Sequence, residues 1–280
     1  TGSLSQSDAG KFWGEGPGPD LRGLIRGSYG VMGGFGMVTK MAVKLHPYPG
    51  PKVFPCEGIL PDQKSFMPEE RFEWVFFTYP TVKNAVDAMY KICHAELGGN
   101  CSKWPTSYLN WYWAKSGEEY WETWKSEYWQ KNCNNMVAVC LWGFTSEKQV
   151  EYEKKVLEDI IGETKGKKVS QEVYDRIVSR IANCWIRTTY GPRVISRSGT
   201  FMVFSIMVDT MDSDMGALKR SKEFIDKYSP PILDCDHTDW IASYEMGHLG
   251  YEEDMYPVEK TVEGLSVVLK GTMKEVEFDV

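Results

Sequence analysis

The chain has 280 residues, a length that suits one large domain or two smaller ones. Its apolar fraction of 42% and charged fraction of 25% are ordinary for a globular protein and argue against a largely disordered chain. The formal net charge of −7, without a run of Lys and Arg, argues against nucleic-acid binding, and no apolar stretch approaches the roughly 20 residues that span a bilayer.

The seven cysteines are odd in number, and no two of them have C-x-x-C spacing. We therefore expect neither a disulfide scaffold nor a zinc site, and no bound metal. This pattern favours a reducing compartment, and we expect the protein to be cytoplasmic. No signal peptide is visible, although Thr1-Gly2-Ser3 is not a natural initiator sequence.

The first 50 residues contain 12 of the 26 glycines, a density typical of tight turns and of backbone packed closely against another group. The alternating run Met37–His46 predicts a half-buried strand. The breaker cluster Pro47–Pro51 ends it, and we expect a domain boundary there with a linker through Pro68.

From residue 72 onward the sequence predicts alternating strands and helices. Strands are predicted at Phe72–Tyr79, Ser107–Trp113, Met136–Phe144, Phe201–Val208 and Trp240–His248. Helices are predicted at Val82–Leu97, from Thr145 or Ser146 to Ile161, at Asp214–Tyr228 and at Val258–Leu269. This order indicates an α+β domain, with an antiparallel sheet built from ferredoxin-like β-α-β repeats and with helices on one face.

The glycine-rich segment has the chemistry of an anion-binding loop. Gly27, Gly30 and Gly33 allow tight turns that direct backbone N–H groups at a pyrophosphate, and Ser28 adds a hydroxyl donor. A Rossmann site needs a strand before such glycines and a helix after them, whereas here a strand follows. No Gly-Lys-Ser/Thr sequence is present either, so we exclude a Walker A loop as well.

The same segment resembles the end of the FAD-binding domain in the vanillyl-alcohol-oxidase family of FAD-linked oxidases. The matching elements occur in the family's order: Thr1-Gly2-Ser3, Gly18-Pro19-Asp20-Leu21, Gly27-Ser28-Tyr29-Gly30, Gly36-Met37-Val38-Thr39-Lys40 and Leu45-His46-Pro47. The resemblance implies that FAD is the cofactor and that its contacts are Gly2, Gly27, Ser28, Gly30, Gly36, Met37, Val38 and Thr39. Gly33-Gly34-Phe35 departs from the family pattern as an insertion, so which glycine faces the flavin stays open.

In that family a first FAD subdomain precedes this segment and supplies most contacts to the pyrophosphate. The resemblance therefore implies that residues 1–55 end an FAD-binding domain and that residues 69–280 form a cap over the substrate. It also implies that about the first half of the protein precedes this sequence. The alternative is that residues 1–50 are only a glycine-rich surface loop.

Two elements of the cap region resemble members of the family that oxidise lactate or glycolate. Trp185-Ile186-Arg187 matches an element whose arginine binds the substrate carboxylate, for which a planar guanidinium fork is well suited. Glu245–Gly250 matches an element whose histidines hold a metal or polarise the substrate hydroxyl. The resemblance implies that Arg187 anchors a carboxylate and that His248 acts as a base or hydrogen-bond donor, with purely structural roles as the alternative for both.

The second histidine of that element is missing, because Tyr251-Glu252-Glu253-Asp254 stands in its place. A family-type metal site is therefore not expected. We interpret the three acidic residues as a solvated turn.

Six tryptophans lie between residues 104 and 129, and Tyr120, Trp124 and Tyr128 share one side of a predicted helix. Such aromatic residues line an apolar substrate pocket or fill a core, and we favour the core.

Together these observations favour an FAD-dependent oxidoreductase that transfers hydride from a hydroxy acid or alcohol to the flavin, with this chain alone inactive. The alternatives are a phenolic or benzylic substrate, or a binding module without catalysis. The expected partner is a small-molecule substrate, and a homo-oligomer or a redox partner protein stays open.

Overall fold

The structure, a computed structural model, describes residues 45–187, 196–208, 210–233, 236, 239–244, 247 and 249–278. The expected strand at Met37–His46 lies almost wholly outside these residues, as does the glycine-rich segment with its predicted FAD contacts. The proposed division of the chain near residues 55–69 therefore stays a prediction.

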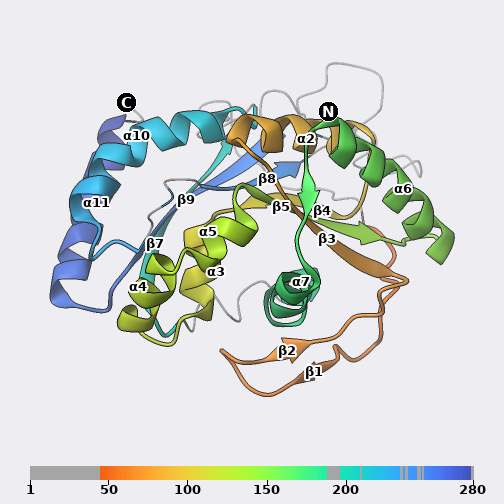
Figure 1. Cartoon of the computed structure of the whole chain (residues 1–280), viewed down its shortest axis with the longest axis horizontal. Helices are drawn as coiled ribbons and strands as arrows, with labels where there is room; N and C mark the ends of the chain where they lie inside the picture. Colours follow the sequence, from red (N-terminus) through yellow and green to blue (C-terminus); the bar gives the residue numbers. More distant parts are fainter. Residues whose placement is uncertain are drawn as a thin grey trace, which may run out of the picture.

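An antiparallel sheet of seven strands forms the centre of the molecule (Figure 1). Its strands are β3 (Phe72–Thr78), β4 (Asn100–Trp104), β5 (Met136–Trp142), β6 (Lys167–Lys168), β7 (Thr200–Val208), β8 (Trp240–Tyr244) and β9 (Leu249–Val258). The spatial order is β6-β3-β5-β4-β8-β9-β7, and every neighbouring pair is antiparallel. A separate hairpin precedes the sheet and consists of β1 (Cys56–Glu57) and β2 (Lys64–Ser65).

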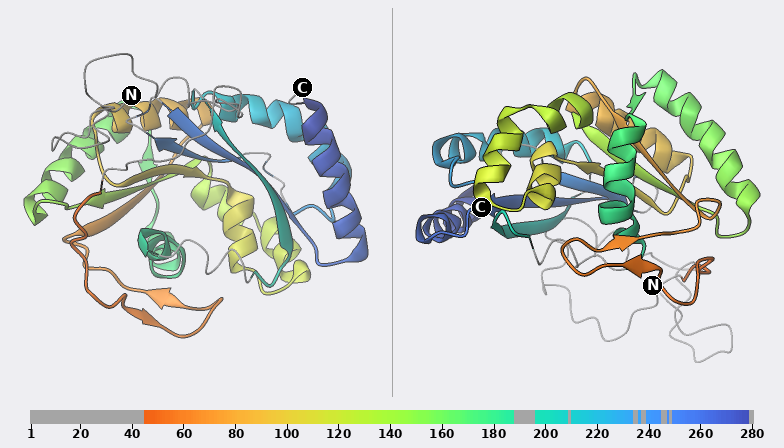
Figure 2. Two further views of the ribbon diagram at one scale, coloured as in Figure 1. Left: turned by 180° about the vertical axis from the view of Figure 1, so that it is seen from behind. Right: turned by 60° about the horizontal axis from the view of Figure 1, so that its bottom comes forward.

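Helices cover both faces of the sheet (Figures 1 and 2). One face carries α2 (Val82–His94), α6 (Glu147–Glu163), α10 (Ser213–Tyr228) and α11 (Val262–Phe278). The other face carries α3 (Thr106–Trp113), α4 (Gly117–Lys125), α5 (Tyr128–Cys133), α7 (Gln171–Ile177), a π-helical turn (Val178–Ala182) and α8 (Asn183–Arg187).

The sheet is made of two units of the predicted ferredoxin-like type. The first unit runs β3-α2-β4-β5-α6-β6, and its strands have the order β6-β3-β5-β4 that is typical of that fold. The second unit runs β7-α10-β8-β9-α11 and repeats the order of the first three strands. The two units join where Ser102 and Lys103 of β4 pair with Ala242 and Ile241 of β8. The α+β class, the antiparallel sheet and the repeats are thereby confirmed.

The expectation of helices on one face only is wrong. Successive residues of β3 alternate between two separate cores, with Trp74 and Phe76 in one and Val75 and Phe77 in the other. In β5 the run Met136–Leu141 is buried throughout. Strands that are apolar on both sides need packing partners on both faces, and the second helical layer supplies them.

Residues Ser107–Trp113, predicted as a strand, form helix α3 instead. The neighbouring segment Asn100–Trp104 takes the strand position between β5 and β8. All residues of α3 except Trp113 are buried, including the polar residues Thr106, Ser107 and Asn110, so the helix has no solvent-exposed polar face. A short helix that is buried all round gives no 3.6-residue pattern, and its high content of aromatic residues therefore favours a strand in the sequence.

The chain between residues 240 and 269 also differs from the prediction. The strand expected at Trp240–His248 ends at Tyr244, and β9 follows where an acidic turn was expected. Glu252 and Glu253 lie in β9 with only 0% and 6% of their surface exposed, so the solvated-turn interpretation is wrong. Helix α11 begins at Val262, later than predicted, because β9 occupies the chain up to Val258.

The remaining predicted elements are confirmed with small shifts at their ends: β3, β5, β7, α2, α6 and α10. The core interpretation of the tryptophan-rich segment is confirmed for Trp104, Trp111, Trp129 and Tyr120, each at most 1% exposed.

Candidate functional site

The residues with predicted roles in the site fall largely outside the described part of the chain. The expected FAD contacts, from Gly2 to Thr39, all lie there, and so does His248. Arg187 ends helix α8, but its side chain is not described. The roles assigned to these residues therefore stay predictions.

The described neighbours of Arg187 and His248 lie at opposite ends of β8. Trp185 stacks on Trp240, the first residue of β8, with ring centroids 5.4 Å apart and planes 15° apart. Gly247 lies beyond the other end, where an added Cβ would be 3.2 Å from Cys93 Cβ. Five strand residues span about 13 Å. Cys93 belongs to the core on the α2 face of the sheet, whereas Trp185 and Trp240 belong to the core on the opposite face. The positions of these neighbours therefore do not favour one substrate that contacts both Arg187 and His248.

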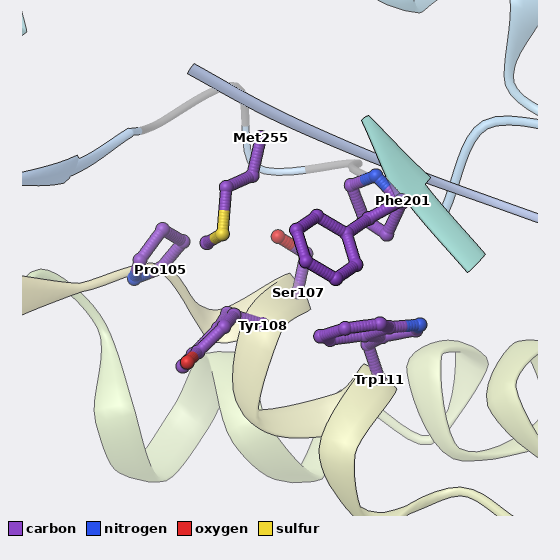
Figure 3. Close-up of a pocket in the computed structure, with 7 residues that line it drawn as sticks. Pro105, Ser107, Tyr108, Trp111, Phe201 and Met255 are labelled. Atoms are coloured by element: carbon purple, nitrogen blue, oxygen red, sulfur yellow. The ribbon is translucent and has the colours of Figure 1, made fainter. Parts of the chain in front are cut away.

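The described residues form a narrow pocket on the aromatic face of the sheet (Figure 3). The cavity itself is only about 10 Å³, the room of about one water molecule, and the 270 Å³ of empty space around it includes open solvent. Helix α3 and the residue before it supply one wall, and strands β7 and β9 supply the other. The lining residues are Pro105, Ser107, Tyr108, Trp111, Phe201, Met255 and Pro257.

The walls of this pocket are apolar and mainly aromatic. The rings of Trp111 and Phe201 meet edge to face, with centroids 5.3 Å apart. Tyr108 contacts Trp111 at 6.0 Å and packs against Tyr112, to which its hydroxyl donates a hydrogen bond of 2.9 Å. No charged side chain is among the lining residues of this pocket. Such a lining suits the apolar or aromatic part of a small molecule.

One polar group interrupts this apolar lining. Figure 3 shows the Ser107 hydroxyl turned towards the space between Met255 and Phe201. The hydroxyl donates to Asp236 Oδ1 at 2.5 Å, and Asp236 Oδ2 accepts from the backbone N–H of Thr106, also at 2.5 Å. Asp236 thus caps α3, whose N-cap residue Pro105 forms no side-chain cap, and it fixes Ser107 at the pocket wall.

An aromatic row continues along the same face towards β9. Trp104 contacts Trp185 at 6.1 Å, Trp185 stacks on Trp240, and Trp240 meets the ring of Tyr251 at 5.9 Å. The Tyr251 hydroxyl donates to Glu253 Oε1 at 3.0 Å. The buried Glu253 is therefore part of a polar contact on this face.

A charged cluster joins the β1–β2 hairpin to the π-helical turn. Asp62 accepts two hydrogen bonds from Arg197, at 2.8 and 3.0 Å, and lies 3.0 Å from the guanidinium of Arg180. Arg180 is buried in the π-helical turn and lies over the ring of Trp113, 4.2 Å from its centroid. The hydrogen bond from Arg197 and the two positive charges hold the pKa of Asp62 below its ordinary value.

Sequence reasoning missed Asp236 and Asp62 as residues that organise this face. Asp236 is 129 residues from Ser107, and Asp62 is 135 residues from Arg197. Neither aspartate lies in a motif, so only the fold reveals its partners. A π-helical turn likewise has no sequence signature, although such turns are frequent at functional sites.

In the described part of the chain, no group of three or more His, Cys, Asp or Glu side chains is arranged to hold a metal ion. No helix among those same residues is long and apolar enough to cross a membrane.

No family model and no curated protein matches this sequence. Two solved structures of alkyldihydroxyacetonephosphate synthase are similar to it over most of its length. One has a TM-score of 0.41 and 13% identity, and the match covers 74% of this chain and 40% of that one. The other has a TM-score of 0.45 and 16% identity, covering 78% and 41%. The chain spans about two fifths of the length of these structures, and similarity at this level does not establish an activity.

Proposed function

We propose that this chain is part of a flavin-dependent oxidoreductase in which the seven-stranded sheet covers the substrate and residues 1–55 help to hold FAD. The observation that carries the proposal is the order of two parts along the chain. The glycine-rich elements between Gly18 and Pro47 come first, and a sheet built from ferredoxin-like units follows. Bound FAD would supply the acceptor for the hydride.

The proposed reaction is hydride removal from the carbon that carries a hydroxyl group in a hydroxy acid or alcohol. Arg187 would hold the carboxylate of a hydroxy acid, and His248 would accept the hydroxyl proton. Fixing the substrate by these two groups would place the reacting carbon in one orientation, which lowers the entropic part of the barrier.

The alternative of a phenolic or benzylic substrate is favoured by the pocket on the aromatic face. An aromatic ring would pack against the single apolar wall that Trp111 and Phe201 form through their edge-to-face contact. Ser107, fixed by Asp236, would accept a hydrogen bond from a substrate hydroxyl. Because the present cavity has room for about one water molecule, Met255, whose side chain is flexible, would have to move aside to admit any ring.

The first test is the absorbance spectrum of the protein, purified together with any sequence that its gene encodes before or after these 280 residues. We expect a flavin spectrum, and its loss in Gly36→Leu, because a bulky side chain blocks close approach of the backbone to the cofactor. Gly162→Ala is the matched control, since no atom lies within 4 Å of the added methyl group. The 280-residue chain alone should bind FAD weakly or not at all, as fluorescence titration would show.

Anaerobic reduction of the flavin then distinguishes the substrates. Reduction by 2-hydroxy acids, with a raised KM in Arg187→Lys and a lowered kcat in His248→Asn, supports the hydroxy-acid reaction. Reduction by benzylic alcohols, with a raised KM in Trp111→Ala, supports the alternative. A colourless protein that binds no flavin overturns the proposal in favour of a binding module without catalysis.

A further inference from the structure

Two cavities lie beside helix α7, and both are roomier than the pocket at α3. Their volumes are about 240 and 280 Å³, and Glu69 and Tyr174 border both of them. The first lies between the helical segment that starts with α7 and the chain segment 66–72, and we call it the α7 cavity. Figures 1 and 2 show α7 between the sheet and the β1–β2 hairpin. Its volume is near the lower end of the range for small-molecule sites, which begins at roughly 300 Å³.

One wall of the α7 cavity is a polar stripe on the continuous helical segment formed by α7, the π-helical turn and α8. Asp175, Ser179 and Asn183 follow one another at intervals of four residues, and all three line the cavity. Each of these side chains has an oxygen that accepts hydrogen bonds. The neighbouring Arg176 points elsewhere, with its guanidinium 5.5 Å from the centre of the Trp113 ring. The helical wall therefore offers hydrogen-bond acceptors to a ligand.

The two ends of this polar stripe differ in burial. Asp175 is exposed, and Gln171 Nε2 donates to its Oδ1 at 2.8 Å. Asn183 is only 6% exposed, and its Nδ2 donates to the Ser65 carbonyl oxygen at 2.8 Å. The Oδ1 of Asn183 accepts no hydrogen bond from the described residues, so a donor in the cavity would satisfy this buried acceptor.

Carboxylates set the charge at the exposed end. Burial raises the pKa of Tyr174, and the nearby carboxylates of Glu69 and Glu73 raise it further. Lys154 of α6 pairs with Glu73 at 2.5 Å and acts only weakly on Glu69. No Lys, Arg or His is among the described residues that line the α7 cavity. Asp175 and Glu69 therefore favour a cation there and repel a carboxylate or a phosphate.

The opposite wall of the α7 cavity is apolar. Phe66, Met67 and Phe72 line it, and Phe66 is 43% exposed. The ring of Tyr174 borders the cavity on the helical side, with its centroid 5.7 Å from that of Phe76. Such a lining suits the apolar body of a small molecule, and the faces of aromatic rings also attract a cation.

The length of the polar stripe limits the ligand further. Asp175 and Asn183 are eight residues apart, which corresponds to a rise of about 12 Å along the helix. A hydrogen bond of about 2.9 Å at each end leaves about 6–8 Å between the two donors of a ligand that reaches both side chains. The donor at Asn183 should be uncharged, because a buried charge without a counter-charge is costly.

We propose that the α7 cavity binds a small amine, with its ammonium group at Asp175, its apolar body against Phe66 and Phe72, and a hydroxyl or amide donor at Asn183. The ammonium group would lie at the exposed end, where the carboxylates are. The uncharged donor would reach the buried end. This site is separate from the pocket at α3, and binding there does not depend on flavin.

Isothermal titration calorimetry of the whole protein with tyramine tests the proposal, because tyramine carries an ammonium group and a phenol hydroxyl on one aromatic body. We expect a dissociation constant of about 0.1–1 mM, as suits so small a ligand. Tyrosol, in which a hydroxyl replaces the ammonium group, should bind about tenfold more weakly. 2-Phenylethylamine, which lacks the phenol hydroxyl, should bind about threefold more weakly.

Variants of the lining locate the binding. Asp175→Asn should weaken tyramine about threefold to tenfold and leave tyrosol unchanged, because only tyramine carries the positive charge. Glu172→Gln is the matched control, since it removes the same charge from the same helix at a residue that does not line the cavity. Trp111→Ala in the pocket at α3 should leave tyramine binding unchanged. No binding of tyramine, equal binding of tyrosol, an Asp175→Asn effect no larger than that of Glu172→Gln, or loss of binding in Trp111→Ala would each overturn the proposal.

Discussion

Replacing Asp62 by asparagine removes the negative charge between Arg180 and Arg197 without changing the size of the side chain. The pair with Arg197 is partly exposed, with 31% and 55% of the two side-chain surfaces accessible, so solvent screens it and it contributes about 0.5–1 kcal/mol. Arg180 is only 11% exposed, and losing its counter-charge costs about a further 1 kcal/mol. We expect Asp62→Asn to lower the free energy of unfolding by about 1.5–2 kcal/mol.

This loss should depend on pH with a definite sign. The pKa of Asp62 is lowered in the folded protein, so the carboxylate stabilises the fold at every pH above the pKa of the unfolded chain, which is about 3.9. The stabilisation disappears as the pH falls through the lowered pKa of the folded state. The difference between the two proteins should therefore be constant from pH 5 to 7 and shrink below about pH 4.

Urea denaturation followed by tryptophan fluorescence measures both effects. Asp87→Asn is the matched control, because the Lys83–Asp87 pair is solvent-exposed, with 68% and 45% of its side-chain surfaces accessible. Its loss should cost clearly less than that of the Asp62 cluster, because solvent screens an exposed pair. The reasoning fails if Asp62→Asn costs no more than Asp87→Asn, or if its cost persists unchanged at pH 2.

Two further predictions use matched pairs within the chain. Gly98→Ala should destabilise the fold by about 2–4 kcal/mol, because the backbone has φ +70° and an added Cβ would lie 2.5 Å from the Cys140 carbonyl oxygen. Gly162→Ala should instead stabilise α6 by up to about 1 kcal/mol. Thermal melts in which the two variants shift the melting temperature in the same direction would contradict this. At pH 8 iodoacetamide should modify the exposed Cys56 rapidly and Cys133 only after unfolding. The reason is that burial raises the pKa of the Cys133 thiol to about 12, so little of it is the reactive thiolate. Equal modification rates of the two cysteines, measured by peptide mass spectrometry, would refute this prediction.

Four elements of the first ferredoxin-like unit, β3, α2, β5 and α6, were predictable because their signals are local. Thr81 accepts a hydrogen bond from the backbone N–H of Asn84 and so begins α2, and the apolar run from Met136 is long enough to mark a buried strand. These features depend on residues close together in the sequence. The ends of the confirmed elements moved by only a few residues for the same reason.

Other elements were less predictable because tertiary contacts decide them. Helix α3 begins at an aspartate cap supplied by Asp236, which no local pattern reveals. Glu252 and Glu253 read as a solvated turn because charged side chains are rarely buried. In the sheet, β9 lies between β7 and β8 with backbone hydrogen bonds on both sides, so the pairing of these strands outweighs the polarity of two side chains.

The division of side chains between the two faces of the sheet indicates where a ligand binds. The face beneath α2 and α6 is filled mainly by Ala, Val, Ile and Leu, which pack closely and leave little reason for a cavity. The opposite face carries most of the tryptophans and tyrosines, whose rigid rings pack less completely and whose N–H and O–H groups need partners. The pocket lined by Trp111 and Phe201, the Ser107 hydroxyl and the buried Glu253 all lie on that face. A substrate should therefore approach the sheet from the side of α3 and α8, and a ligand-induced change in tryptophan fluorescence that Phe201→Ala abolishes would show it.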